Sequence, residues 1–282
     1  MSSCKDRAVI TLTTDFGLAD DYAGTLKGAI LCHCRQAAII DLTHAIPPQD
    51  IAAAATSIGH SFRFFPNGSV HLVIVDPGVG SQRRILALKA ADHLFIAPDN
   101  GVLTPFLTEA RFQEAFQVNN RELFPGTVST TFHGRDIMAP IAARLACGMD
   151  ISLAGPELSR QECLQISLPA ARVSAEGIIG EVVHIDHFGN LRTSITARDL
   201  AALPAGAGLS ISLRGRAIAT VSTTYSDAAP GALIALIDSR EHLEIALVCG
   251  NAALVLGCRL GDRISVTTWK CKKNQTASHR NR

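Results

Sequence analysis

The first 150 residues alternate short apolar runs with helix-like segments, and this pattern narrows the possible folds more than any other feature. The apolar runs cover residues 8–13, 38–42 and 70–75, and each stops at a polar residue. The helix-like segments cover residues 20–32 and 50–64. Apolar strands that alternate with helices are typical of a parallel sheet covered on both faces. The pattern therefore predicts an α/β domain built on a doubly wound, mostly parallel sheet.

The pattern changes near residue 165, where helix signals fade and β-like runs with Gly-rich turns take over. Before this point we also expect a strand pair at residues 85–90 and 93–97 and a helix at residues 134–147. Short strands of this kind predict a small C-terminal β-barrel or sandwich. The β-like runs cover residues 177–185, 209–213, 217–221, 232–238, 243–248 and 262–268. We expect an N-terminal domain at 1–165, a linker at 166–172, a β-barrel domain at 173–272 and a basic, disordered tail at 273–282.

The composition excludes several classes of protein. Hydrophobic residues make up 47% of the chain and charged residues 18%, which argues against disorder. The net charge of +1 gives no global field for nucleic acid or a membrane surface. No apolar stretch is long enough to cross a bilayer, no signal peptide is visible, and the eight cysteines contain no CxxC pair. We therefore expect a cytoplasmic protein with reduced thiols and no bound metal.

Three chemically distinct side chains stand where regular elements meet loops. Asp76 ends the 70–75 run in the segment VDPGVGSQRR, which also carries Arg83, and His133 lies in FHGRDIMAP just ahead of a helical pattern. Ligands of open α/β sheets bind at the carboxyl ends of strands. The set combines an acceptor, a permanent cation and a group that titrates near neutrality, so it is able to bind and deprotonate a water. Taken singly, Asp76 is also consistent with a turn residue, Arg83 with a solvated surface charge and His133 with a structural histidine.

More motifs of this type recur along the chain. In order they are TTDFG (13–17), DLTH (41–44), VDPGVGSQRR (75–84), APDNG (97–101), FHGRDIMAP (132–140), IDHFGNLRTSI (185–195) and SREHLEIALVCGNAA (239–253). Together they resemble the S-adenosylmethionine hydroxide adenosyltransferases, also called adenosine-forming SAM hydrolases. The superfamily of these enzymes includes the fluorinases and chlorinases. The resemblance extends over nearly the whole chain, from about residue 10 to residue 269.

The resemblance implies a fold, an assembly and a reaction. It implies an α/β domain followed by a β-barrel, and a homotrimer that binds its ligand between the N-domain of one subunit and the C-domain of its neighbour. The implied reaction converts S-adenosylmethionine and water into adenosine and L-methionine, without a cofactor. The hydrolytic triad of the family falls on Asp76, Arg83 and His133.

Other positions match residues that bind substrate in the family. Asp15 matches the carboxylate that binds the ribose hydroxyls, and Asp186, Phe188 and Asn190 match the motif that holds the amino-acid end. Segments that line the methionine and adenine sites match at Ser239, Asn251 and Ala252, while Asp21, Asp99 and Asn100 either bind the substrate or shape turns.

The chain also departs from its halogenating relatives. Those enzymes carry a Tyr–Thr pair where this chain has Asp76 and Val79, and tryptophans where it has Gln49 and Arg192. Halide chemistry is therefore disfavoured, and adenine or ribose stacking must be achieved differently. Ser194 and Glu241 also differ from the usual family residues, which weakens inferences about individual contacts in the C-domain.

The implied chemistry leaves several alternatives open. Attack at the ribose C5′ needs an aligned nucleophile and no acid, because the sulfonium is a good leaving group. Arg83 would stabilise negative charge on the water, and either His133 or Asp76 would take its proton. A different enzyme class, a metal-dependent phosphoesterase, would use Asp15, Asp41, His44, Asp76 and His133. A non-catalytic protein that binds SAM or adenosine, or an enzyme for another adenosyl compound, is the remaining alternative.

Overall fold

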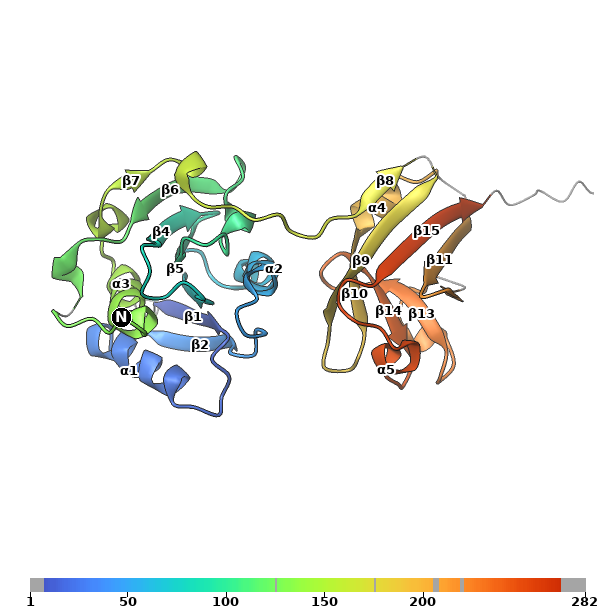
Figure 1. The fold of residues 1–282 in the computed structure, drawn as a ribbon, viewed down its shortest axis with the longest axis horizontal. Helices are drawn as coiled ribbons and strands as arrows, with labels where there is room; N and C mark the ends of the chain where they lie inside the picture. The colour runs from blue at the N-terminus through green and yellow to red at the C-terminus, as the bar shows by residue number, and fades with distance from the viewer. Residues whose placement is uncertain (1–7, 125, 175, 205–207, 219–220, 270–282) are drawn as a thin grey trace, which may run out of the picture. The chain divides into compact units, whose positions relative to one another are not determined.

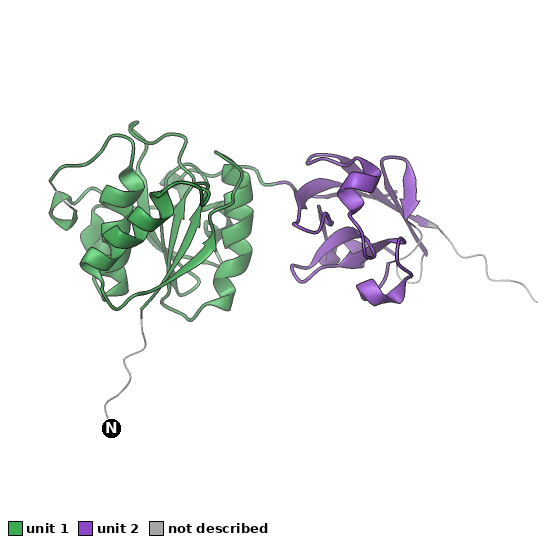
Figure 2. Ribbon diagram, turned by 90° about the horizontal axis from the view of Figure 1, so that it is seen from below, with its two compact units in different colours: residues 1–168 green, residues 169–282 purple. Residues whose placement is uncertain are grey.

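The computed structural model describes residues 8–124, 126–174, 176–204, 208–218 and 221–269. The chain forms two compact units, Met1–Leu168 and Pro169–Arg282, which Figure 2 shows in different colours. The first unit is mixed α/β and the second consists mainly of β-strands, as Figure 1 shows. The tail expected at residues 273–282 lies outside the described residues.

The first unit is built on a seven-stranded sheet with the order β2-β1-β3-β5-β4-β6-β7. The neighbours β2, β1, β3 and β5 run parallel, whereas β4, β6 and β7 are added through antiparallel pairs. This arrangement confirms the predicted α/β class. The strands are β1 (Val9–Thr14), β2 (Ala38–Thr43), β3 (Val70–Ile74), β4 (Ile85–Ala90), β5 (His93–Pro98), β6 (Phe112–Gln117) and β7 (Glu157–Leu158).

Helices cover both faces of this sheet, as Figure 1 shows. Helices α1 (Tyr22–His33) and α3 (Ala139–Ala146) lie on one face, and α2 (Ile51–Ser61) lies on the other. The strands are apolar on both sides because successive side chains point to opposite faces. Leu72 of β3 belongs to the core that contains Leu26 of α1, and the next residue, Val73, belongs to the core that contains Ile58 of α2.

The strand order places the loops after β1 and β3 next to each other. The chain leaves β1 through α1 to reach β2, and then passes through α2 to reach β3 on the other side of β1. The direction of winding reverses at this point. In open α/β sheets the carboxyl ends of such strands leave a crevice that binds ligands. The fold therefore brings the segments that begin at Asp15 and Val75 to the rim of one crevice.

Helices α2 and α3 each begin with a distinct local feature. Asp50 accepts a hydrogen bond from the Ala53 backbone N–H at 2.8 Å and so caps the first turn of α2. The α-helix ends at Ser61 and a 3₁₀ turn, Phe62–Phe64, completes the segment predicted as helical. The helix predicted at 134–147 begins instead with a π-helical turn, Gly134–Met138, before α3. Such π turns are common at functional sites.

Two buried histidines form a polar chain across the centre of the sheet. His71 of β3 lies 2.7 Å from Thr11 Oγ1 through Nδ1 and 3.1 Å from His93 Nδ1 through Nε2. Both rings are buried, and the His71 ring stacks on Phe95. Burial, together with the neighbouring His93, lowers the pKa of His71 to about 3. Both imidazoles therefore serve as neutral hydrogen-bonding groups inside the core.

We expect His71 to make the protein acid-labile. Its folded-state pKa of about 3 lies below the ordinary value of 6.5, so protonation favours the unfolded chain. The stability that the neutral ring provides is complete above pH 6.5 and is lost as the pH falls from 6.5 towards 3. Denaturant unfolding of wild type and His71→Gln between pH 7 and pH 4 measures this. The variant should lose less stability than wild type on acidification. Equal losses would show that His71 is not a source of the acid lability.

The second unit is an antiparallel sheet with the order β12-β11-β15-β9-β10-β14-β13, to which β8 is added beside β9. Val221 bridges to Ala235 of β13, so the segment after β12 returns to the opposite edge and nearly closes the barrel. This confirms the predicted barrel. Its strands are β8 (Arg172–Ser174), β9 (Gly177–Ile185), β10 (Leu191–Thr196), β11 (Gly208–Leu213), β12 (Arg216–Ile218), β13 (Leu233–Ile237), β14 (His242–Leu247) and β15 (Arg263–Trp269), with the short helices α4 (Ala197–Ala201) and α5 (Ala252–Leu256).

Several strands differ from the sequence-based prediction. Strands β6, β7, β8 and β10 were not predicted. The strand expected at 217–221 is shorter, because β12 ends at Ile218, and residues 219–220 lie outside the described part of the chain. Among the described residues, no helix is both long and apolar enough to cross a membrane.

Candidate active site

A cavity of about 310 Å³ lies in the first unit at the carboxyl ends of β1 and β3. It is therefore located where the strand order predicts a ligand crevice. Its walls combine carboxylates, aromatic rings and an imidazole, a mixture typical of small-molecule sites. The lining residues are Asp15, Phe16, Gln49, Ile74, Asp76, Pro77, Val79, Thr131, Phe132, His133 and Gly134.

A buried ion pair joins Asp76 to Arg83. Arg83 donates through Nε to Asp76 Oδ1 at 2.7 Å and through Nη2 to Asp76 Oδ2, so the contact is bidentate. The Arg83 side chain is 9% exposed and the Asp76 side chain 6% exposed. A bidentate guanidinium–carboxylate contact is the strongest type of paired charge, and burial makes the loss of either partner costly. Asp76 lines the cavity and is held in place by Arg83, which is not itself among the lining residues.

His133 contacts the same arginine. Its Nδ1 atom lies 3.2 Å from Arg83 Nη2. Because a guanidinium only donates, Nδ1 must accept, and the neutral ring then carries its proton on Nε2. Burial and the adjacent Arg83 cation both lower the pKa of His133. The structure therefore brings Asp76, Arg83 and His133 into one connected group, with the histidine neutral.

The direction of this pKa shift predicts the pH dependence of the site. His133 has a folded-state pKa below the ordinary value of 6.5, so the neutral ring predominates at and above that pH. Protonation at lower pH would place a proton on Nδ1 and break the contact with Arg83. We expect kcat/KM for the wild type to have an acid limb with a midpoint below 6.5. His133→Gln should lack that limb, and a wild-type midpoint above 6.5 would contradict the arrangement.

Two glycines allow the loops that carry these residues to approach each other. Gly80 has φ +80°, and a Cβ atom there would lie 2.5 Å from the Thr130 carbonyl oxygen. At Gly134 a Cβ atom would lie 2.9 Å from Ile74 Cδ1 of β3. A side chain at Gly80 would meet the backbone of Thr130 and push apart the two segments that carry Asp76 and His133. A side chain at Gly134 would meet the end of the Ile74 side chain, which is able to move, so the stricter constraint on the spacing lies at Gly80.

Asp15 and two phenylalanines, Phe16 and Phe132, also line the cavity. Asp15 Oδ2 accepts from the Gln49 backbone N–H at 2.8 Å, which fixes the carboxylate at the end of β1. Phe16, Tyr22 and Phe132 pack with ring centroids 5.5–5.8 Å apart, and both phenylalanines line the cavity. The two phenylalanines were not predicted as site residues. Phe16 directly follows Asp15 and Phe132 directly precedes His133, and this adjacency was the available signal.

Asn100, Asp99 and Asp21 occupy different places from the triad. Asn100 donates through Nδ2 to the Val75 carbonyl at 2.9 Å, and so braces the strand end just before Asp76. Asp99 is buried and accepts from Arg84 Nε at 2.8 Å. Asp21 is exposed directly before α1. Among the described residues, those that line the cavity include none of these three.

Most candidate residues of the second unit lie around the turn after β9. Asp186 Oδ1 accepts from the backbone N–H groups of Phe188 at 2.9 Å and Asn190 at 2.8 Å, and its Oδ2 accepts from Asn190 Nδ2 at 3.0 Å. Phe188 is 72% exposed, whereas Asn190 is buried. Asn251 caps α5. It also packs closely on Gly189, where an added Cβ atom would lie 2.1 Å from Asn251 Cγ. Ala252 is buried behind this turn and Ser239 is exposed after β13.

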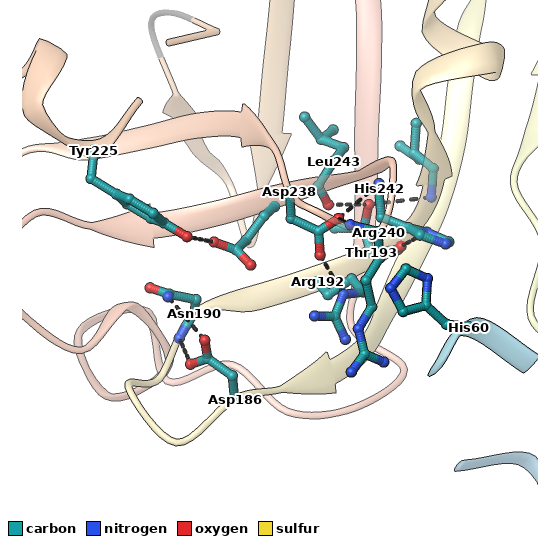
Figure 3. A network of polar contacts seen from close by, with 12 residues as sticks. His60, Asp186, Asn190, Arg192, Thr193, Tyr225, Asp238, Arg240, His242 and Leu243 are labelled. Atoms are coloured by element: carbon teal, nitrogen blue, oxygen red, sulfur yellow. Dashed lines mark hydrogen bonds and ion pairs between the residues drawn. The ribbon is translucent and has the colours of Figure 1, made fainter. Parts of the chain in front are cut away.

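Further polar side chains lie close to this turn, as Figure 3 shows, and of these only Arg192 was named from the sequence. Arg192 donates through Nε to Asp238 at 2.5 Å, and Tyr225 donates to Glu244 Oε1 at 2.7 Å. Glu244 is only 3% exposed, and burial raises its pKa. This second unit therefore presents a buried polar network beside the Asp186 turn.

The five residues of the metal-based alternative do not form one group. Asp41 lies 2.6 Å from Lys27 Nζ and 3.1 Å from His44 Nε2, and His44 Nδ1 lies 2.8 Å from Thr14 Oγ1. Neither Asp41 nor His44 lines the cavity that contains Asp76. Within the described part of the chain, no group of three or more His, Cys, Asp or Glu side chains has the arrangement to hold a metal ion.

Comparison with known families identifies the class of protein. The SAM hydroxide adenosyltransferase N-terminal domain matches residues 10–155, and the C-terminal domain of the same family matches residues 180–265. The chain therefore belongs to the SAM hydroxide adenosyltransferase family.

Individual relatives agree with this assignment. An (R)-S-adenosyl-L-methionine hydrolase of Salinispora tropica is 38% identical over 92% of this chain and 97% of its own length. A fluorinase of Actinopolyspora mzabensis is 28% identical over 95% of this chain and 99% of its own. The crystal structure of an uncharacterized conserved protein from Thermotoga maritima superposes with a TM-score of 0.85 at 35% identity, over 92% of this chain and 99% of the other.

Proposed function

We propose that this chain is an adenosine-forming S-adenosyl-L-methionine hydrolase. One water attacks the ribose C5′ atom, the C5′–S bond breaks with its electrons moving to sulfur, and adenosine, L-methionine and one proton are released. The observation that carries the proposal is the connected Asp76–Arg83–His133 group, of which Asp76 and His133 line the cavity, in a chain from this family. Binding alone would not require a carboxylate, a cation and a neutral imidazole in one connected group.

We propose Asp76 as the group that accepts the proton of the water. His133 has one lone pair, on Nδ1, and Arg83 already donates to it. The Asp76 oxygens also accept from Arg83, but each carboxylate oxygen has a second acceptor site. Asp76 can therefore bind a water while the contacts of Arg83 persist. His133, with its proton on Nε2, would orient the water as a donor.

Arg83 has a different task in this mechanism. A guanidinium remains charged at every accessible pH and favours negative charge that develops on the attacking oxygen. The sulfonium leaves as a neutral thioether, so no acid is needed for the leaving group. Positioning of the water behind the C–S bond would supply most of the rate enhancement.

We expect residues of both units to contact the substrate. We propose that Asp15 binds the ribose hydroxyls and that Phe16 and Phe132 supply the apolar surface that tryptophans provide in the halogenating relatives. The other proposed contacts lie at Asp21 and Asn100 in the first unit, and at Asp186, Phe188, Asn190, Ser239, Asn251 and Ala252 in the second. Because the contacts divide between the units, we also propose a homotrimer with sites shared between subunits, located in the cytoplasm.

We further propose that the (R) epimer at sulfur is the preferred substrate. The Salinispora tropica relative is named for this epimer. The sulfonium is pyramidal, so a site that holds both the adenosyl and the 3-amino-3-carboxypropyl groups fits one epimer better. Incubation of the full-length protein with each purified epimer, followed by chromatography for adenosine and L-methionine, tests the function. Binding without product would instead support the non-catalytic alternative.

We expect turnover to need no metal. Arg83 already places a positive charge next to Asp76, and this cation would repel a divalent ion from the carboxylate. Adenosine formation should therefore continue at the same rate after exhaustive dialysis against a chelator. Loss of activity that zinc, magnesium or manganese restored would contradict a metal-free reaction.

A further inference from the structure

Two cysteines from distant parts of the sequence meet at the ends of α1 and α3. Cys34 directly follows α1 and Cys147 directly follows α3. Their Sγ atoms are 2.6 Å apart, which is about 0.5 Å more than a covalent S–S bond of about 2.05 Å. The fold of the first unit thus brings two thiols within reach of a bond, and the proposed hydrolytic chemistry uses neither of them.

The two thiols differ in their access to solvent. Cys147 is exposed, whereas Cys34 is only 5% exposed. Burial, with a hydrogen bond from Cys147, raises the pKa of Cys34 to about 11. Reactivity of a cysteine depends on access and on its thiolate fraction. An oxidant in solution will therefore meet Cys147 first, and Cys34 is placed to react second.

We propose that Cys34 and Cys147 are a site of reversible oxidation that closes to a disulfide when the protein meets a hydroperoxide. The Cys147 thiolate attacks one peroxide oxygen, the O–O bond breaks, and hydroxide or alkoxide leaves, which gives a sulfenic acid. The Cys34 sulfur then attacks the Cys147 sulfur and displaces hydroxide, which takes the Cys34 proton and leaves as water. Two thiols are oxidised to one disulfide, and one peroxide is reduced to two molecules of water, or to water and an alcohol.

The bond would join two helices that pack on the same face of the sheet. Leu26 and Ile30 of α1 share one apolar core with Ile141 and Leu145 of α3. The linked positions are 113 residues apart, so the disulfide would constrain a long loop of the unfolded chain. We expect oxidation to raise the Tm of the first unit by roughly 5–10 °C. A reductant should reverse the shift.

The test treats the reduced full-length protein with hydrogen peroxide and maps its disulfides by peptide mass spectrometry. We expect a Cys34–Cys147 peptide as the main product, together with the higher Tm. Cys34→Ser should stop at a Cys147 sulfenic acid that dimedone traps. Cys249→Ser removes an exposed cysteine outside the pair and serves as the matched control, so it should behave like wild type.

Three outcomes would overturn the proposal. One is peroxide treatment that leaves Cys34 and Cys147 unlinked. Another is a main product that joins Cys147 to the exposed Cys32, because that would show that the buried thiol does not take part. The third is a cross-linked protein with an unchanged Tm, since the bond would then not tie the two helices in the folded state.

Discussion

Replacement of Arg83 or His133 by alanine should lower the turnover of S-adenosylmethionine by roughly a hundredfold or more, with a much smaller loss of affinity. Both side chains belong to the group that would act on the attacking water, and neither is proposed to hold the adenosyl or methionine parts. Single-turnover adenosine formation, measured beside calorimetric affinity, separates the two effects. Arg83→Lys keeps the charge but loses the bidentate contact with Asp76, so an intermediate rate is expected.

The matched control for this series is Arg63→Ala, because Arg63 is an exposed arginine on the 3₁₀ turn after α2. It should turn over like wild type. Circular dichroism checks that each variant is folded, since loss of Arg83 leaves a buried carboxylate without its partner. Normal turnover by saturated Arg83→Ala and His133→Ala would reduce the group to a structural role.

Asp15→Ala should act in the opposite way and weaken binding by roughly a hundredfold, with a smaller change in the saturated rate. The carboxylate would lose the two ribose hydroxyls that we propose it binds, and hydrogen bonds to charged groups are the stronger type. Asp20→Ala is the matched control, because Asp20 is exposed on the loop that follows Asp15. If Asp15→Ala bound as tightly as wild type, the ribose site would lie elsewhere.

The strand-end residues were the most predictable part of the site. Apolar runs predicted β1 and β3 closely, and the polar residue that ends each run is placed by the sheet topology alone. Asp15 and Asp76 therefore met at one crevice, as expected. The two short β-like runs at 85–97 also formed the predicted pair β4 and β5.

The contacts of the two arginines were not predictable from their adjacency. Arg83 pairs with Asp76, while Arg84 reaches Asp99. In an extended segment successive side chains point to opposite sides, so neighbours in sequence reach different partners. Only the position of the second carboxylate in space shows which partner each arginine takes.

Other features depended on packing between distant segments. Phe132 became a cavity wall because it packs against Phe16 and Tyr22, which are more than a hundred residues earlier. Glu244 lies in an apolar run, and its buried state depends on Tyr225 from another segment of the barrel. The π-helical turn at Gly134–Met138 likewise has no simple sequence pattern, since it repeats neither the strand nor the α-helix period.

The most direct test of the proposed reaction is hydrolysis of S-adenosylmethionine in water enriched in oxygen-18. Attack of water at the ribose C5′ atom predicts one heavy oxygen in adenosine, bound at the 5′ carbon, and none in L-methionine. Mass spectrometry of both products, with Arg83→Ala as the slow control, measures this. Adenosine without the heavy 5′ oxygen, or no adenosine from either sulfonium epimer, would contradict the account.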